Sequence, residues 1–163
     1  MDILDSLAAD HRRMRHVLEQ ISHELGRYLR ARPDAVRRLR AWVDVYIDYV
    51  ARVHIPRERC LRNYLGEHDD AETAVAGPGA WQQLRDCLAR PLPRAERLSL
   101  RRRLVALMRA SEEAMSHEEQ ALFVASRDRL SRIERHTLAL RWMLYGPAAG
   151  SAEATRMVRV TAP

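Results

Sequence analysis

The stretch from Trp42 to Leu65 constrains the fold more than any other part of this chain. Its apolar residues recur at alternating steps of three and four, which is the spacing of one face of an amphipathic helix. These residues are Val43, Ile47, Val50, Leu61 and Leu65. His54 and Glu58 fall on the same face, so a helix that buries this face also buries an imidazole and a carboxylate.

Two polar side chains on an apolar face need a chemical reason. Residues four apart on a helix lie one above the other, so His54 and Glu58 can reach a single point. A carboxylate that faces a core is unfavourable unless it is paired or binds a metal. A His and a Glu that project into a helical bundle are typical ligands of carboxylate-bridged iron sites, so the pair predicts a metal site.

Length and composition favour one helical domain. A chain of 163 residues is long enough to bury a core of its own. Gly and Pro are sparse, while aliphatic and charged residues dominate, which is typical of helical proteins. The net charge of +6 comes from arginine alone, because the chain has no lysine. The use of arginine in place of every lysine is better explained by a bias in genomic base composition than by a binding function.

The sequence predicts neither export nor membrane insertion. The first ten residues carry acidic groups and no long apolar run, so no signal peptide is expected. No segment approaches the roughly 20 apolar residues of a membrane span. The two cysteines, Cys60 and Cys87, form no disulfide framework, which favours a reducing compartment. We therefore expect a cytoplasmic protein with no membrane partner.

Apolar seams predict helices on both sides of the central stretch. A first helix is expected from Ile3 to Leu29, with His11 on its apolar face and His16 and His23 off it. The next helix is expected to start at an Asp34 N-cap and to end at Gly66.

Pro56 falls inside this second helix, where proline typically costs ~3 kcal/mol and produces a kink. The kink either opens the helix around a site or is merely tolerated.

The second half of the chain begins with a surface connection at residues 67–80. Three further helices are expected over residues 81–90, 94–126 and 132–144. Glu118 places another carboxylate on the apolar seam of the longest of them.

Three segments resemble the motifs of the hemerythrin-like, or HHE cation-binding, family. They are ILDSLAADHRRM at 3–14, YIDYVARVHIPRERCL at 46–61 and AMSHEEQALF at 114–123. The second motif normally contains His-His-Pro-Lys-Glu and reads His-Ile-Pro-Arg-Glu here, so Pro56 belongs to the motif. The resemblance covers about residues 1–143.

This resemblance implies an all-α fold: an up-down four-helix bundle around a non-haem di-iron site, here with an additional short C-terminal helix. It divides the chain into a bundle over residues 1–146 and a loosely ordered tail over residues 147–163. Members of the family bind oxygen, sense redox state or nitric oxide, or handle iron. By the same resemblance, four residues occupy metal-ligand positions: His11, His54, Glu58 and Glu118.

Two of the five histidines that usually bind metal in this family are missing. Ala114 replaces one of them, and the other should lie near Cys87 or Leu88. His117 cannot simply replace the residue at 114, because three helical steps turn its direction to about 60° from that of Ala114. Cys87 could supply a thiolate, which suits iron or zinc.

Two functions remain open. The first is a metal-binding domain with a reduced ligand set, which holds one non-haem iron and takes a small diatomic ligand. The alternative is a metal-free degenerate bundle that serves as a regulatory or protein-interaction module, with arginines paired to Glu58 and Glu118. Nucleic-acid binding is disfavoured because acids are spread among the arginines and no recognition motif occurs. No nucleophile–base pair or nucleotide-binding motif is present, so we do not expect an enzyme.

Overall fold

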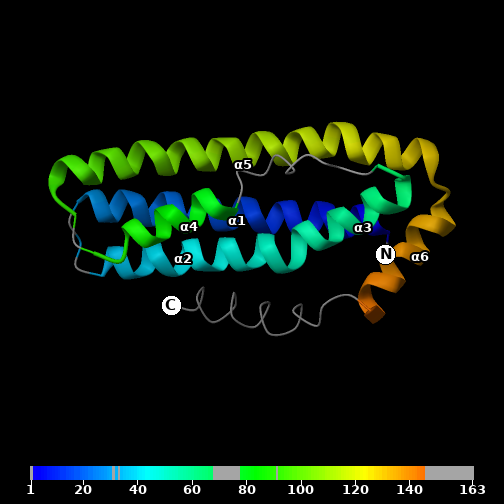
Figure 1. The fold of residues 1–163 in the computed structure, drawn as a ribbon, viewed down its shortest axis with the longest axis horizontal. Helices are drawn as coiled ribbons and strands as arrows, with labels where there is room; N and C mark the ends of the chain where they lie inside the picture. The colour runs from blue at the N-terminus through cyan, green and yellow to red at the C-terminus, as the bar shows by residue number, and fades with distance from the viewer. Residues whose placement is uncertain (1, 31, 33, 68–77, 91, 146–163) are drawn as a thin grey trace.

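The computed structural model describes residues 2–30, 32, 34–67, 78–90 and 92–145. Within these residues all regular structure is helical and no strand occurs, which confirms the all-α expectation (Figure 1). The expected tail at 147–163 and most of the connection at 67–80 lie outside the described residues. The elements are α1 (Ile3–Leu29), α2 (Ala35–Tyr49), η1 (Val50–His54), α3 (Ile55–Leu65), α4 (Pro78–Cys87), α5 (Arg94–Arg129) and α6 (Arg132–Tyr145).

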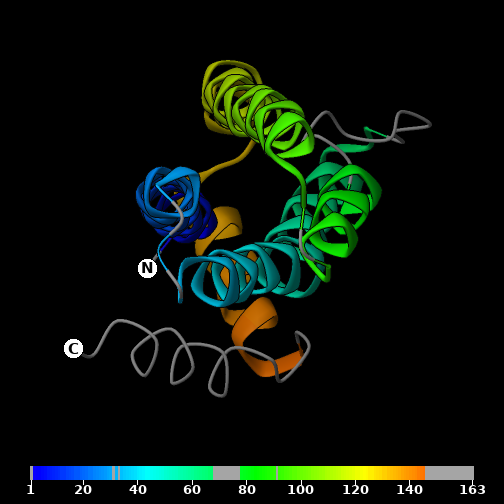
Figure 2. The ribbon, with the colours of Figure 1, turned by 90° about the vertical axis from the view of Figure 1, so that its left-hand side faces the viewer.

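The longer helices lie side by side around a common interior. α5 runs the length of the described structure, with α1 beside it and α2 and α3 following one another on the other side (Figure 1). In the end-on view, α1, α2, α4 and α5 surround the interior (Figure 2). α4 packs on α2 and α5, and α6 packs on α1. No described helix has the length and apolar character needed to cross a membrane.

α1 has the bounds expected from its seam. The Asp2 side chain caps its first turn, and Asp5 accepts a hydrogen bond from the Asp2 backbone N–H at 3.2 Å, which completes a capping box. His11 is fully buried on this helix, whereas His16 and His23 are exposed as expected.

The side-chain cap predicted at Asp34 is wrong. Asp34 precedes α2, but its carboxylate accepts no hydrogen bond from the backbone of that helix. It accepts one from Arg27 at 2.9 Å instead and forms an ion pair with Arg38 at 2.9 Å. Two guanidinium groups compete successfully for the carboxylate, so Asp34 joins α1 to α2.

A π-helical turn, η1, interrupts the helix that was expected to continue with only a kink. Pro56 gives the physical reason, because it has no N–H and its ring would collide with the carbonyl group four residues earlier. The wider turn is closed by a bond from the Ile55 N–H to the Val50 carbonyl oxygen. The π-helical turn thus accommodates Pro56, and α2, η1 and α3 follow one another without a break.

α4 differs most from its expected bounds. It begins and ends three residues earlier than 81–90, with Pro78 as its first residue. Proline is favourable there because the first helical N–H needs no partner within the helix. α5 starts at Arg94 as expected and continues three residues beyond the expected end, and α6 covers the expected fifth helix.

The buried apolar residues form two clusters, and the candidate site lies where they meet. On α1, Leu7 belongs to one cluster and Met14 to the other, with His11 between them. On α5, Glu118 likewise falls between Met115 and Leu122. Polar residues at this junction interrupt what would otherwise be one continuous core.

Candidate metal centre

Three of the four residues expected to bind metal converge inside the bundle. One possible ligand atom each from His11, His54 and Glu118 lies within 4.8 Å of the other two. The two histidines are fully buried and Glu118 is 5 % exposed. They come from α1, η1 and α5, so only the packing of three helices brings them together.

His11 is held between two carboxylates. Its Nε2 atom lies 3.1 Å from Glu118 Oε2, and its Nδ1 atom lies 2.8 Å from Glu119 Oε1. Arg15 donates a hydrogen bond to the same Glu119 oxygen at 3.0 Å. A carboxylate on one ring nitrogen fixes the orientation of the imidazole and directs the other nitrogen toward a metal.

Glu119 is a functional candidate that the seam pattern does not identify. It is next to Glu118 in the chain, so it points about 100° away on the helix and is only partly buried. One weak indication of its role was present in the sequence. Arg15 follows His11 by one helical turn, so both can contact the same carboxylate.

His54 has no hydrogen-bond partner among the described residues for either ring nitrogen. Its Nε2 atom lies 3.2 Å from Glu118 Oε2, but the geometry is not that of a hydrogen bond. Glu118 Oε1 is also buried without a partner. Unpaired buried polar atoms are rare in native proteins, and here three of them gather at one place.

Aromatic contacts hold the imidazoles in place. The ring centroids of His11 and His54 are 5.1 Å apart, with the rings tilted by 59°. Phe123 also stacks on His11, with ring centroids 5.7 Å apart and an interplanar angle of 11°. The His11 imidazole therefore packs against two other rings.

Glu58 is buried near the cluster but outside the group of converging ligand atoms. Its Oε1 atom accepts a hydrogen bond from Arg62 Nε at 2.7 Å, whereas its Oε2 atom has no partner. Burial and the negative charge of Glu118 raise the pKa of Glu58 in spite of Arg62. Of the four predicted ligands, Glu58 is thus the one that the structure leaves apart.

Glu118 and Glu119 keep their negative charge, because their pKa values are lowered. Burial works against the ionised form of Glu118, but contacts with His11 and His54 outweigh it and lower its pKa to about 2. For Glu119, burial is likewise outweighed by Arg15 and His11, so its pKa is also lowered. Burial would lower the pKa of His11, yet the two carboxylates raise it.

Among the described residues, no further histidine or cysteine joins the group of converging ligand atoms. Ala114 is buried on the seam one turn before Glu118, as expected, and His117 is exposed. Cys87 lies 3.8 Å from Arg103, which is about 22 Å along α5 from Glu118. Neither His117 nor Cys87 therefore completes the ligand set.

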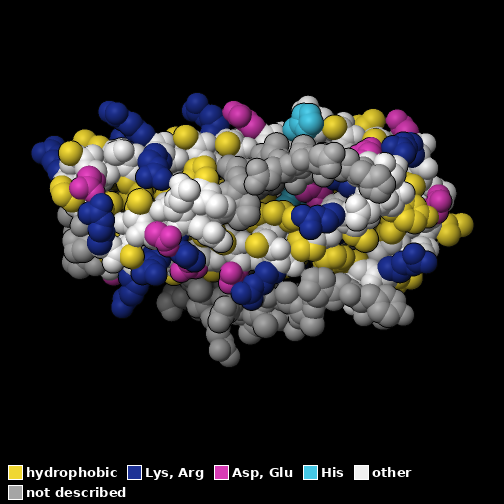
Figure 3. Space-filling model, viewed as in Figure 1, with side chains coloured by type: hydrophobic (Ala, Val, Ile, Leu, Met, Phe, Trp, Pro, Cys, Tyr) yellow, Lys and Arg dark blue, Asp and Glu magenta, His cyan; other side chains and the backbone are white. Residues whose placement is uncertain are grey.

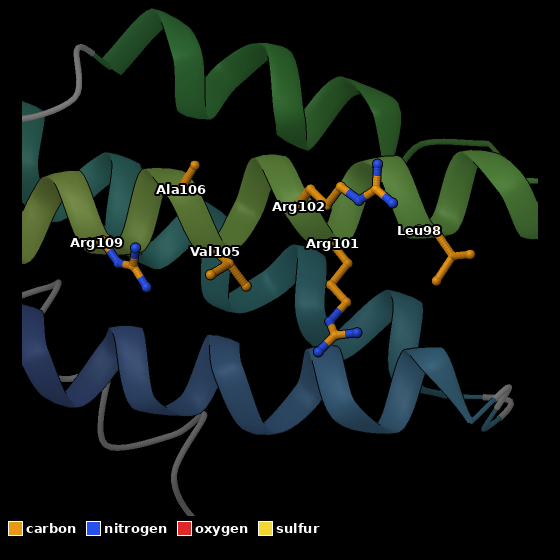
Figure 4. Close-up of a pocket in the computed structure, with 6 residues that line it drawn as sticks. All are labelled: Leu98, Arg101, Arg102, Val105, Ala106 and Arg109. Atoms are coloured by element: carbon orange, nitrogen blue, oxygen red, sulfur yellow. The ribbon is translucent and has the colours of Figure 1, made fainter.

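A shallow hollow of about 420 Å³ on the surface of α5 is separate from this cluster. Three arginines and three small or aliphatic residues line it: Leu98, Arg101, Arg102, Val105, Ala106 and Arg109 (Figure 4). On the face shown in Figure 3, basic and acidic side chains are interspersed. The hollow contains none of the candidate ligands.

No family model, no curated protein and no solved structure matches this chain. The fold and the site define an all-helical protein with a buried cluster of two histidines and a glutamate. Its function is inferred from that cluster.

Proposed function

We propose that this protein is a hemerythrin-like, up-down four-helix bundle that binds one divalent transition-metal ion, iron in the first place. His11, His54 and Glu118 are its ligands, and Glu58 is the carboxylate closest to completing the set. One observation carries this proposal: both nitrogens of His54 and one oxygen of Glu118 are buried without a hydrogen bond to any described residue and lie close together.

The donor set fits the ion. Two imidazole nitrogens and one carboxylate, with positions left open, are typical ligands of non-haem Fe(II). Glu119 supports the same assignment, because it binds the Nδ1 atom of His11 and leaves Nε2 for the metal. An iron with open positions can take oxygen or nitric oxide, so we propose a role in sensing or iron handling rather than in catalysis.

A metal-free regulatory module is the second candidate. Arg62 binds Glu58 at 2.7 Å, and His11 with its raised pKa is a counter-ion for Glu118. Both buried carboxylates thus have a cationic partner without a metal. This candidate leaves unexplained why neither ring nitrogen of His54 has a hydrogen bond within the described part of the chain.

Two measurements test the proposal. The first is the metal content of protein purified without oxygen, and the second is a titration of the metal-free protein with Fe²⁺ and Co²⁺. The parent is expected to bind one ion per chain. His54→Gln should weaken binding by more than about tenfold, because it removes a ligand. His117→Gln is the matched control on α5: its side chain is exposed beside Glu118, so binding should not change.

Binding of neither ion to the folded parent would reject the metal site and favour the module. Equal affinity in His54→Gln and His117→Gln would show that metal binds elsewhere.

A further inference from the structure

Asp10 is fully buried and immediately precedes His11 in the chain. Its Oδ1 atom accepts a hydrogen bond from the Tyr49 hydroxyl group at 2.5 Å, and its Oδ2 atom accepts one from Arg57 at 2.6 Å. Burial and the charge of Asp10 raise the pKa of Tyr49 to about 12, so the phenol remains a donor. Asp10 points about 100° away from His11 and is not itself in the metal cluster.

The two side chains that donate hydrogen bonds to Asp10 lie on either side of η1. Tyr49 is the last residue of α2, and Arg57 is in the first turn of α3. Between them are the π-helical turn and Pro56, which supplies no N–H to the carbonyl of Arg52. The regular helical hydrogen-bond pattern is interrupted in this segment, which carries His54.

Further contacts hold both partners in place. Arg13 donates a hydrogen bond to the Tyr49 hydroxyl oxygen at 3.2 Å. The guanidinium group of Arg57 lies over the Trp142 ring at 5.3 Å from its centroid. One carboxylate on α1 therefore connects to α2, α3 and α6.

We infer that Asp10, Tyr49 and Arg57 form a clamp that fixes the π-helical turn against α1 and so sets the position of His54 relative to His11. Asp10 is then a positioning residue, and its role in metal binding rests on the function proposed above. The same residue that precedes one ligand in sequence holds the segment of the other ligand at both ends. Val50 and Val53 pack in the same apolar cluster as Met14 of α1, and the clamp adds hydrogen bonds to α1 on both sides of His54.

Tyr49→Phe and Tyr46→Phe form a matched pair that tests the clamp. Both tyrosines are buried on α2, but the Tyr46 hydroxyl faces Ser111 of α5 and makes no hydrogen bond to the clamp. Tyr49→Phe should lower the Co²⁺ affinity about threefold to tenfold and alter the visible absorption of bound Co²⁺. Asp10→Asn should lower the affinity by about 10- to 100-fold, as is typical when a group that supports a ligand is lost. Tyr46→Phe should change neither affinity nor spectrum.

Hydrogen exchange of the metal-free proteins gives a measurement that does not depend on metal. Amides of residues 50–55 should exchange faster in Tyr49→Phe than in the parent, and at the parental rate in Tyr46→Phe. Leu39→Ala, a core truncation far from η1, serves as a control for lowered stability alone and should leave the Co²⁺ spectrum unchanged.

Equal exchange in the two tyrosine variants overturns the clamp, whether or not metal binds. If the parent binds no Co²⁺ but Tyr49→Phe still exchanges faster in this segment, the clamp stands and the proposed metal function fails. If Asp10→Asn does not fold, Tyr49→Phe carries the test alone.

Discussion

His11 is the residue whose protonation most directly couples the candidate site to the stability of the fold. Glu118 and Glu119 face it, and His54 lies beside it. The two carboxylates raise its pKa above the ordinary value of 6.5, despite burial. The folded metal-free protein therefore keeps a proton on His11 at a pH where the unfolded chain has released it. This contribution to stability is complete below pH 6.5 and is lost as the pH rises through the folded pKa.

His11→Gln should remove that contribution. We expect the difference in unfolding free energy between metal-free parent and His11→Gln to shrink as the pH rises from about 6 to about 9. Denaturant titrations at several pH values measure it, with the exposed His16→Gln as a control that shows no such trend. A difference that grows with pH would mean that His11 is neutral in the folded protein.

Metal binding should have the opposite pH dependence. A metal displaces the proton from His11, so the affinity of the parent for Co²⁺ should rise over the same pH range.

Glu118 contributes to stability at acidic pH. Its pKa of about 2 keeps this carboxylate charged well below the ordinary pKa of 4.5. That part of the stability is present above pH 4.5 and is lost only as the pH falls toward 2.

Ala114 is the position on α5 at which the resemblance to hemerythrin-like motifs predicts a ligand histidine. It is buried on α5 one turn before Glu118, next to the small side chain of Ser111. Ala114→His should therefore increase the affinity for iron, although the added volume could cost ~1–3 kcal/mol of stability. Metal titration and thermal unfolding measure the two effects.

A second histidine at Cys87 should add nothing to Ala114→His, because Cys87 faces Arg103 far from the cluster. This corrects the expectation that the third helix offers a ligand position near Cys87. A folded Ala114→His protein with parental affinity would show that the seam position at 114 does not face the metal.

At the scale of the elements, the end of α3 depends on one residue. Gly66 adopts the left-handed conformation with φ 73°, as expected from its place at the helix end. A Cβ atom added there would meet no other atom within 4 Å, so only backbone strain opposes a larger residue. Gly66→Ala should lower the unfolding free energy by about 1 kcal/mol.

Gly79→Ala is the control for Gly66→Ala, because Gly79 is helical and also has open space around it. It should keep or raise stability, since alanine favours helices. Denaturant unfolding distinguishes the two, and Co²⁺ affinity should stay the same in both. A loss of affinity in Gly66→Ala would mean that the end of α3 also positions the cluster.

At the scale of the whole molecule, the helices bring together too few ligands for two metal ions. The described residues supply one group of converging ligand atoms, with Glu58 beside it. α4 contacts α2 and α5 but contributes no residue to that group. A di-iron centre needs a larger set of histidines and bridging carboxylates.

We therefore expect no oxo-bridged di-iron absorbance in air-exposed protein, even with excess iron. Visible absorption spectra and the ratio of iron to protein measure this. Two irons per chain with that spectrum would show that water or a residue outside the described ranges completes a second site.

Much of the local structure follows from the sequence because it depends on neighbours in the chain. The seam of α1 predicts both its bounds and the burial of His11, and the same reasoning predicts the burial of His54, Glu58 and Glu118. Periodicity identifies which side of a helix faces the core, since an apolar face is stable only when it is buried.

Periodicity along the chain did not predict which polar side chains pair with one another. Whether Asp34 caps α2 or binds Arg27, and whether Glu58 joins the cluster or binds Arg62, depends on competition between partners in space. The contact between Asp10 and Tyr49 likewise joins residues 39 positions apart. Spacing along the chain was enough to predict most helices and their buried faces, but not the π-helical turn η1 or the bounds of α4. Which buried polar groups meet depends on how the helices pack, because hydrogen bonds and ion pairs form over about 3 Å.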